Sequence, residues 1–195
     1  MEDNKQDIHK IITQDKVLFF DMDGTLDDTD NANYLSFKQA IQTVINPAFI
    51  IPFNPLERFN RTILQREYPN LDEKDYQEII KLKERFYFEN IGQTKLLPFA
   101  NEILNKFFEL NTTVLVTNCR EDRAILTLNQ HCLTDKFKHK IFRKSIDKDY
   151  HVNKFRNALS YLNLNPNNVV VFENELFEID EALKAGIPES NIITI

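Results

Sequence analysis

The chain has 195 residues, 42% hydrophobic and 28% charged, an ordinary globular composition with enough length for one α/β core and a modest accessory subdomain. Its formal net charge of −6 argues against a broad positive surface, so we expect no nucleic-acid partner, although a local basic groove is compatible with this charge. No apolar run approaches the length needed to span a bilayer, so we expect no membrane partner.

Five short runs rich in β-branched and aromatic residues predict strands, and helical patterns fill most of the sequence between them. In chain order these runs are Lys16–Phe20, Thr113–Thr117, Lys140–Phe142, Asn168–Phe172 and Asn191–Ile195. Continuous apolar runs of this length are typical of parallel strands covered on both faces. We therefore expect an α/β fold with a doubly wound parallel sheet, whose active site lies beyond the carboxyl ends of the strands.

The long segment between the first two runs has mostly helical patterns, interrupted by prolines. It predicts an inserted helical subdomain at residues 30–95, with residues 1–29 and 96–195 forming the core. The helices expected from the pattern in this region are Tyr34–Ile45, Leu56–Glu67, Glu73–Asn90 and Ala100–Leu110.

The most informative segment is Phe19-Phe20-Asp21-Met22-Asp23-Gly24-Thr25-Leu26, directly after the first run. A surface turn is one interpretation, because Asp-Gly pairs favour turns. The apolar strand that precedes the two carboxylates favours a functional site instead. The segment resembles motif I of the haloacid dehalogenase-like hydrolases, Asp-x-Asp-Gly-Thr-Leu, and the resemblance extends over nearly the whole chain because three further motifs follow in order.

The resemblance implies a Rossmann-like core with a small helical cap, of the phosphoglycolate phosphatase and β-phosphoglucomutase type. It implies that Asp21 is the nucleophile that forms an aspartyl-phosphate and that Asp23 is the general acid and base. Gly24 and Thr25 would lie at the bound phosphate. Phosphotransferring members carry the second aspartate and the dehalogenases lack it, so Asp23 argues against dehalogenation.

Motifs II and III supply a hydroxyl and an ammonium group in this family. Thr117 matches the first, with Asn118 beside it at the phosphate, although a plain Thr-Asn strand end is the alternative. Lys154, near the start of a helix expected at Phe155–Leu162, is our choice for the second. The family's usual Lys-Pro pair is missing, so Lys148 and Lys144 compete with it, and each of these lysines could simply be solvated.

Motif IV supplies acidic metal ligands, and Glu173 and Asn174 occupy its place. The family usually has Asp at the second position, but an amide oxygen can also bind Mg²⁺. The alternative is an acidic helix start favoured by the helix dipole. By resemblance, Mg²⁺ is the cofactor, held by Asp21, Asp23, Glu173 and Asn174, and hard oxygen ligands without a His or Cys cluster agree with that metal.

Two further sequence features concern the substrate. Asp27 replaces an apolar residue of the relatives and would add negative charge beside the site. In the cap, Arg58 and Arg61 are the leading candidates to contact an anionic substrate, ahead of Arg66 and Arg85, with a solvated helix face as the alternative.

We therefore predict a Mg²⁺-dependent phosphomonoesterase acting on a small phosphorylated metabolite. A sugar phosphomutase of the same fold, or a weakly catalytic or non-catalytic module that binds phosphometabolites, are the alternatives. Cys119 and Cys132 have neither metal-ligand nor disulfide spacing, so we expect a reduced, cytoplasmic compartment. The sequence names neither the metabolite nor the oligomeric state.

Overall fold

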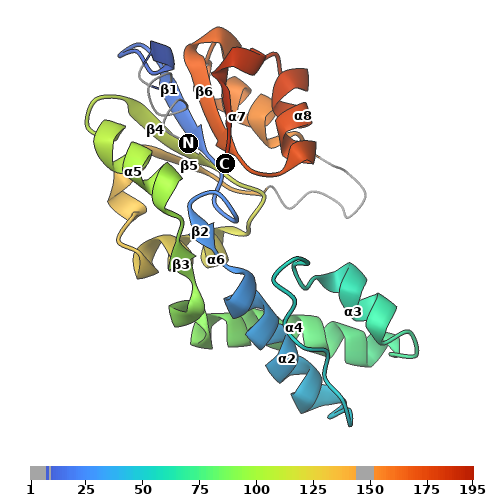
Figure 1. Ribbon diagram of the computed structural model, residues 1–195. Helices are drawn as coiled ribbons and strands as arrows, with labels where there is room; N and C mark the ends of the chain where they lie inside the picture. Colours follow the sequence, from blue (N-terminus) through green and yellow to red (C-terminus); the bar gives the residue numbers. More distant parts are fainter. Residues whose placement is uncertain (1–7, 9, 144–151) are drawn as a thin grey trace. The chain divides into compact units, whose positions relative to one another are not determined.

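Figure 1 shows the computed structural model of the chain, which describes residues 8, 10–143 and 152–195. The chain forms two compact units: a core unit, Met1–Asp27 with Leu96–Ile195, and a helical unit, Asp28–Lys95. The chain passes between the units through two short strands that pair with each other, β2 (Asp27–Asp28) and β3 (Lys95–Leu96).

The core unit is built on a five-stranded parallel sheet with the order β5-β4-β1-β6-β7. The first strand of the chain lies in the middle, so later strands were added on both sides of it. The predicted doubly wound α/β sheet is confirmed, and every predicted strand is present within one or two residues. The strands are β1 (Val17–Phe20), β4 (Thr112–Val116), β5 (His139–Ile141), β6 (Val169–Glu173) and β7 (Ile192–Thr194).

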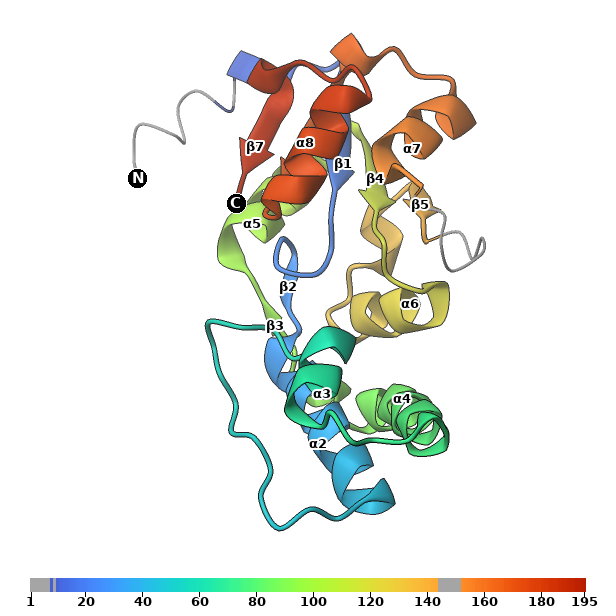
Figure 2. The ribbon, with the colours of Figure 1, turned by 90° about the vertical axis from the view of Figure 1, so that its right-hand side faces the viewer.

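Helices cover both faces of this sheet, as Figure 2 shows for α7 and α8 on one of them. Alternation of side chains along β1 explains the two layers, since Leu18 and Phe20 pack with α5 and α6, whereas Phe19 packs with α7 and α8. The helices are α5 (Pro98–Phe107), α6 (Glu121–Gln130), α7 (Lys154–Leu162) and α8 (Leu176–Lys184), and short 3₁₀ turns cover Thr134–Lys136, Pro166–Asn168 and Glu189–Asn191.

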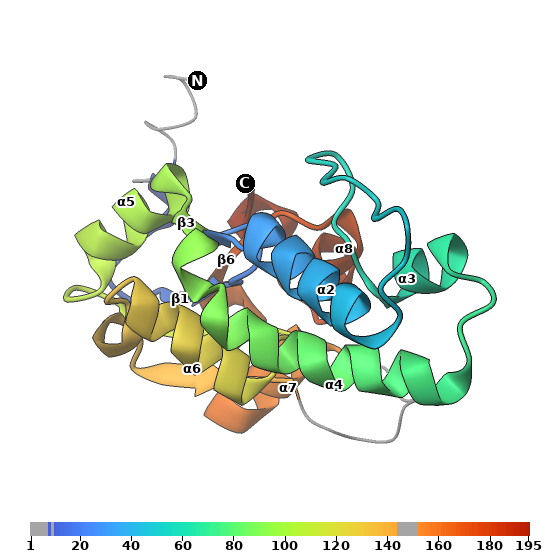
Figure 3. The same cartoon turned by 90° about the horizontal axis from the view of Figure 1, so that it is seen from below.

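The helical unit has its own hydrophobic core. Helix α2 packs along α4, as seen in Figure 3, and α3 closes the cluster through the buried side chains of Ile63 and Leu64. Tyr34, Phe37 and Ile79 contribute from α2 and α4. The elements of this unit are α2 (Asp30–Val44), α3 (Arg61–Glu67), α4 (Glu73–Glu89) and the 3₁₀ turn Ile91–Gln93.

Two helix predictions in this unit are wrong at their starts. Helix α2 begins at Asp30, four residues before the predicted start at Tyr34. The pattern predicts a helix over Leu56–Glu67, but α3 begins only at Arg61. Two asparagine side chains explain the difference: Asn54 accepts a hydrogen bond from the amide of Leu56 at 3.0 Å, which makes a turn. Asn60 then accepts one from the amide of Ile63 at 3.0 Å and caps the helix. Over the described residues, no helix is long and apolar enough to cross a membrane.

Candidate active site

Three predicted site residues lie at the carboxyl ends of adjacent strands. Asp21 follows β1, Thr117 follows β4 and Glu173 ends β6. Their backbones continue the sheet ladder, because the amide of Asp21 donates to the carbonyl of Phe172 at 3.1 Å and that of Thr117 donates to Ile141 at 3.0 Å. All three are buried, so the sheet itself fixes the directions of their side chains.

Lys154 joins two of these strand ends. It is the first residue of α7, and its Nζ donates to Oδ1 of Asp21 and to Oε2 of Glu173, both at 2.7 Å. A third carboxylate, that of Glu178, lies 3.7 Å from the same nitrogen. The side chain of Lys154 is only 5% exposed, so these contacts are shielded from solvent.

The electrostatics of this cluster favour a charged lysine. Burial raises the pKa of Asp21 well above its usual range, Lys154 opposes that rise, and Glu173 adds to it. For Lys154, burial acts to lower the pKa, but the attraction of Asp21, Glu173 and Glu178 outweighs burial and raises it. Three buried carboxyl groups thus share one ammonium group.

The competing lysines cannot be compared with Lys154 in the same way. Lys144 and Lys148 lie outside the described residues. Contact with the predicted nucleophile favours Lys154 among the three, and its motif III role stays a prediction.

The loop after β1 fits closely against the loop after β6. Gly24 has a φ of +81°, and a Cβ on it would lie 2.4 Å from the side-chain nitrogen of Asn174. Only glycine avoids both the strained backbone and this clash. Thr25 is fully buried, and its hydroxyl forms a 3.1 Å hydrogen bond with the side-chain amide of Asn174. The predicted phosphate-binding pair and a predicted metal ligand are therefore in contact.

Three oxygen atoms surround the side-chain amide of Asn174. Its nitrogen donates to the backbone oxygen of Asp23 at 3.2 Å, to the hydroxyl oxygen of Thr25 at 3.1 Å and to Oε1 of Glu173 at 3.3 Å. The residues predicted to hold Mg²⁺ offer carboxylate, backbone and amide oxygens, which are the ligand types that this ion prefers. Among the described residues, no group of three or more His, Cys, Asp or Glu side chains is arranged to hold a metal ion.

Glu173 is fully occupied by protein contacts. Its Oε1 accepts hydrogen bonds from the amides of Asn174 and Glu175 at 2.9 and 3.0 Å, while Oε2 accepts from Lys154. Glu173 could bind a metal ion either directly or through a water molecule, and these contacts favour binding through water. Glu173 also holds the motif IV loop and the lysine together.

Glu178 is a site residue that the sequence interpretation missed. It lies in the first turn of α8, is 6% exposed, and accepts a hydrogen bond from Asn118 at 2.8 Å as well as facing Lys154. The contact places Asn118, a predicted phosphate-binding residue, at the edge of the same cluster. The signal that could have found Glu178 is a second carboxylate five residues after Glu173.

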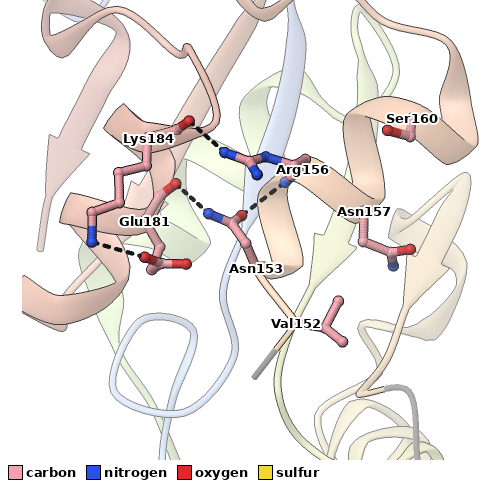
Figure 4. Close-up of a pocket in the computed structure, with 7 residues that line it drawn as sticks. All are labelled: Val152, Asn153, Arg156, Asn157, Ser160, Glu181 and Lys184. Carbon is pink, nitrogen blue, oxygen red and sulfur yellow. Dashed lines mark hydrogen bonds and ion pairs between the residues drawn. The ribbon is translucent and has the colours of Figure 1, made fainter. Parts of the chain in front are cut away.

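A hollow of about 440 Å³ lies between α7 and α8, and Figure 4 shows its lining. Asn153 accepts from the amide of Arg156 at 2.8 Å and donates to the carbonyl of Glu181 at 2.7 Å. Arg156 donates to the carbonyl of Lys184 at 3.0 Å. None of the predicted site residues lines this hollow, but its contacts tie the two helices that carry Lys154 and Glu178.

Two further pairs lie beside motif I. Nη2 of Arg123 donates to Oδ1 of Asp23 at 2.9 Å, and Nε2 of His131 lies 3.3 Å from Oδ1 of Asp27. Burial, together with the charge of Asp23, raises the pKa of Asp27 to about 8. Asp27 is therefore mainly protonated at neutral pH, which differs from the expectation that it adds a negative charge to the site.

The predicted cap arginines lie in the helical unit. Arg58 lies in the loop before α3, and it donates to Asp30 at 2.8 Å and to Thr29 at 3.0 Å. Arg61 is the exposed first residue of α3. Arg66 pairs with the carboxylate of Glu57 at 2.9 Å. A substrate contact by Arg58 or Arg61 stays a prediction.

Comparison with known proteins identifies the family. The model of the haloacid dehalogenase-like hydrolase family matches residues 18–191, so the chain belongs to that family. The family resemblance and the hydrolase class expected from the sequence are thereby confirmed.

Solved structures of this fold include several phosphatases. A predicted phosphoglycolate phosphatase from Haemophilus somnus 129pt is 20% identical, with a TM-score of 0.72 over 90% of this chain and 84% of that one. A predicted phosphatase from Clostridium acetobutylicum is 21% identical, with a TM-score of 0.70 over 92% and 83%. A protein assigned as a beta-phosphoglucomutase from Thermotoga maritima is 20% identical, with a TM-score of 0.63 over 92% and 84%. At these identities the likeness establishes the fold.

Proposed function

We propose that the protein is a Mg²⁺-dependent phosphomonoesterase that works through an aspartyl-phosphate on Asp21. The observation that carries this proposal is the buried bridge from Lys154 to Asp21 and Glu173 at the carboxyl edge of the sheet. Phosphoryl transfer depends mainly on alignment and charge compensation, and this edge offers a fixed carboxylate next to a fixed ammonium.

In the first step, an oxygen of Asp21 forms a bond to phosphorus while the bond from phosphorus to the leaving oxygen breaks. Asp23 gives its proton to that leaving oxygen, so the alcohol departs neutral. In the second step, water attacks phosphorus, its proton passes to Asp23, and the bond to Asp21 breaks. Inorganic phosphate is released and both aspartates return to their starting states.

The remaining residues of the site hold the phosphoryl group and its charge. Lys154 compensates negative charge between nucleophile and phosphate, and Thr117 offers its hydroxyl to the phosphoryl oxygens. Asn118 and the backbone amides around Gly24 and Thr25 would complete the phosphate contacts.

The residues that would hold Mg²⁺ are Asp21, the backbone oxygen of Asp23, and Asn174, with Glu173 acting through water. The three carboxyl groups that lie around Lys154 support this assignment. When bound, the cation supplies charge that lets two anions, carboxylate and phosphate, approach each other.

We assign the helical unit the role of a cap that selects a small phosphate ester. Support comes from its place in the sequence, between Asp23 and Thr117, and from its separate core. We place the protein in the cytoplasm, because Cys119 and Cys132 form no disulfide within the described part of the chain.

The test is phosphate release from p-nitrophenyl phosphate and a panel of phosphometabolites, with and without Mg²⁺, for the wild type and Asp21→Asn. We expect Mg²⁺-dependent turnover that the variant loses. Trapping of ³²P on the wild-type protein, absent from Asp21→Asn, would identify the aspartyl-phosphate. Turnover that survives Asp21→Asn or is indifferent to Mg²⁺ would refute the mechanism.

The second candidate is a sugar phosphomutase, favoured by the fold shared with the Thermotoga maritima protein. It would use the same aspartates but return the phosphoryl group to another hydroxyl. Isomer formation without phosphate release distinguishes it. Metabolite binding without either reaction would indicate a binding module, the role to which the neutral Asn174 points.

A further inference from the structure

Arg123 is an ionic partner of the proposed proton-transferring group. It is the third residue of α6, and its guanidinium donates to Oδ1 of Asp23 at 2.9 Å. The two side chains are 14% and 21% exposed, so water screens their attraction only partly. Both residues lie in the core unit, so the pair belongs to one compact body.

Arg123 lies at a position in its helix where a positive charge is unfavourable, and Asp23 compensates for this. The first turn of a helix carries partial positive charge and favours acidic residues, which Glu121 and Asp122 supply here. A cation in the same turn is disfavoured unless a hydrogen-bond acceptor compensates it, and Oδ1 of Asp23 is such an acceptor. Arg120, at the N-cap, shows the ordinary case: it is 54% exposed and pairs with Asp122 on the surface.

Asp23 lies in a short loop with two other carboxyl residues. Asp21 is two positions before it in the sequence, and the backbone of Asp23 pairs with that of Asp27. The hydrogen bond from Arg123 holds Oδ1 of Asp23 and so fixes the rotation of the carboxyl plane, which leaves the other oxygen to carry the proton.

We propose that Arg123 is a positioning residue that orients Asp23 for proton transfer, an inference that rests on the function proposed above. The role has a specific consequence. Esters with a poor leaving group require the proton from Asp23, whereas p-nitrophenolate leaves readily without one. Loss of Arg123 therefore acts selectively on the reaction step that needs a correctly oriented acid.

The test compares the rate of the first turnover for two substrates, the best alkyl phosphate found in the panel and p-nitrophenyl phosphate. First-turnover rates are needed because the later attack of water also uses Asp23. We expect Arg123→Gln to slow the alkyl ester on the order of 10- to 100-fold and the nitrophenyl ester less than about 3-fold. Arg123→Lys should recover part of the loss, and the matched control Arg120→Gln should change neither rate.

A double variant makes the positioning role falsifiable. In an Asp23→Asn background the acid is gone, so adding Arg123→Gln should cause no further loss for the alkyl ester. Equal losses for both esters, a rise in KM alone, or an additive loss in the double variant would overturn the role. Wild-type protein that turns over neither ester would overturn the proposed function and the role with it, whereas wild-type turnover with an unchanged rate ratio in Arg123→Gln overturns the role alone.

Discussion

Substitution of Asp27 by Asn should change how the stability of the protein depends on pH. Asp27 is fully buried and its side chain has no hydrogen-bond partner among the described residues. Burial and the charge of Asp23 raise its pKa from 3.8 to about 8. The folded state therefore binds this proton more tightly than the unfolded state, so its stabilising effect is complete below about pH 4 and is lost as pH rises towards 8.

The size of this stability change follows from the difference between the pKa values of Asp27 in the unfolded and folded states. Between the two pKa values each pH unit costs the wild type about 1.4 kcal/mol of unfolding free energy, because the unfolded chain releases a proton that the folded chain retains. From pH 5 to pH 7 the loss is about 3 kcal/mol, a large part of the stability of an ordinary domain. Asparagine has nearly the same shape and does not titrate, so Asp27→Asn should escape this loss.

Urea unfolding followed by circular dichroism at pH 5, 6, 7 and 8 measures the effect. The difference in unfolding free energy, Asp27→Asn minus wild type, should increase with pH, whatever its sign at pH 5. Asp135→Asn is the control, because Asp135 is exposed on the same unit. Parallel curves for Asp27→Asn and the wild type would refute the reasoning, because they would mean that the folded protein binds the proton of Asp27 no more tightly than the unfolded chain does.

Three further substitutions test other parts of the structure. Lys154→Gln should lower turnover by about 10²- to 10³-fold in phosphatase assays while the far-UV spectrum stays unchanged, because it removes the ammonium group from Asp21; wild-type turnover would contradict the site. Gly24→Ala should lower the midpoint of thermal unfolding, with a cost of at least about 1 kcal/mol, since the added Cβ meets Asn174 in a left-handed backbone; an unchanged midpoint would exclude the close packing. Asn60→Ala should cost about 1 kcal/mol in urea unfolding by removing the cap of α3, and a neutral effect would argue that water replaces the cap.

Local patterns in the sequence were enough to predict the strands of the sheet and most of the helices. Val17–Phe20 is apolar throughout, and Val169–Glu173 is apolar except for its last residue, which is the condition for strands buried on both faces. Motif I is contiguous, so its chemistry could be recognised without knowing the fold. The start of α3 could not be predicted from periodicity, because two asparagine side chains compete with the helix for backbone hydrogen bonds.

The partners of the motif residues depended on the tertiary structure. Lys154 lies 133 positions from Asp21 in the chain, and Arg123 lies 100 positions from Asp23. Nothing in the local sequence distinguishes a buried ion pair from a solvated lysine or arginine, since the choice is made by what the adjacent strands and helices bring together. The sequence by itself therefore determined the fold class and the hydrolase family, and it predicts Asp21 as the nucleophile. Only the packing of α6, α7 and α8 on the sheet decided which charges meet, because desolvation and Coulomb attraction act through space, not along the chain.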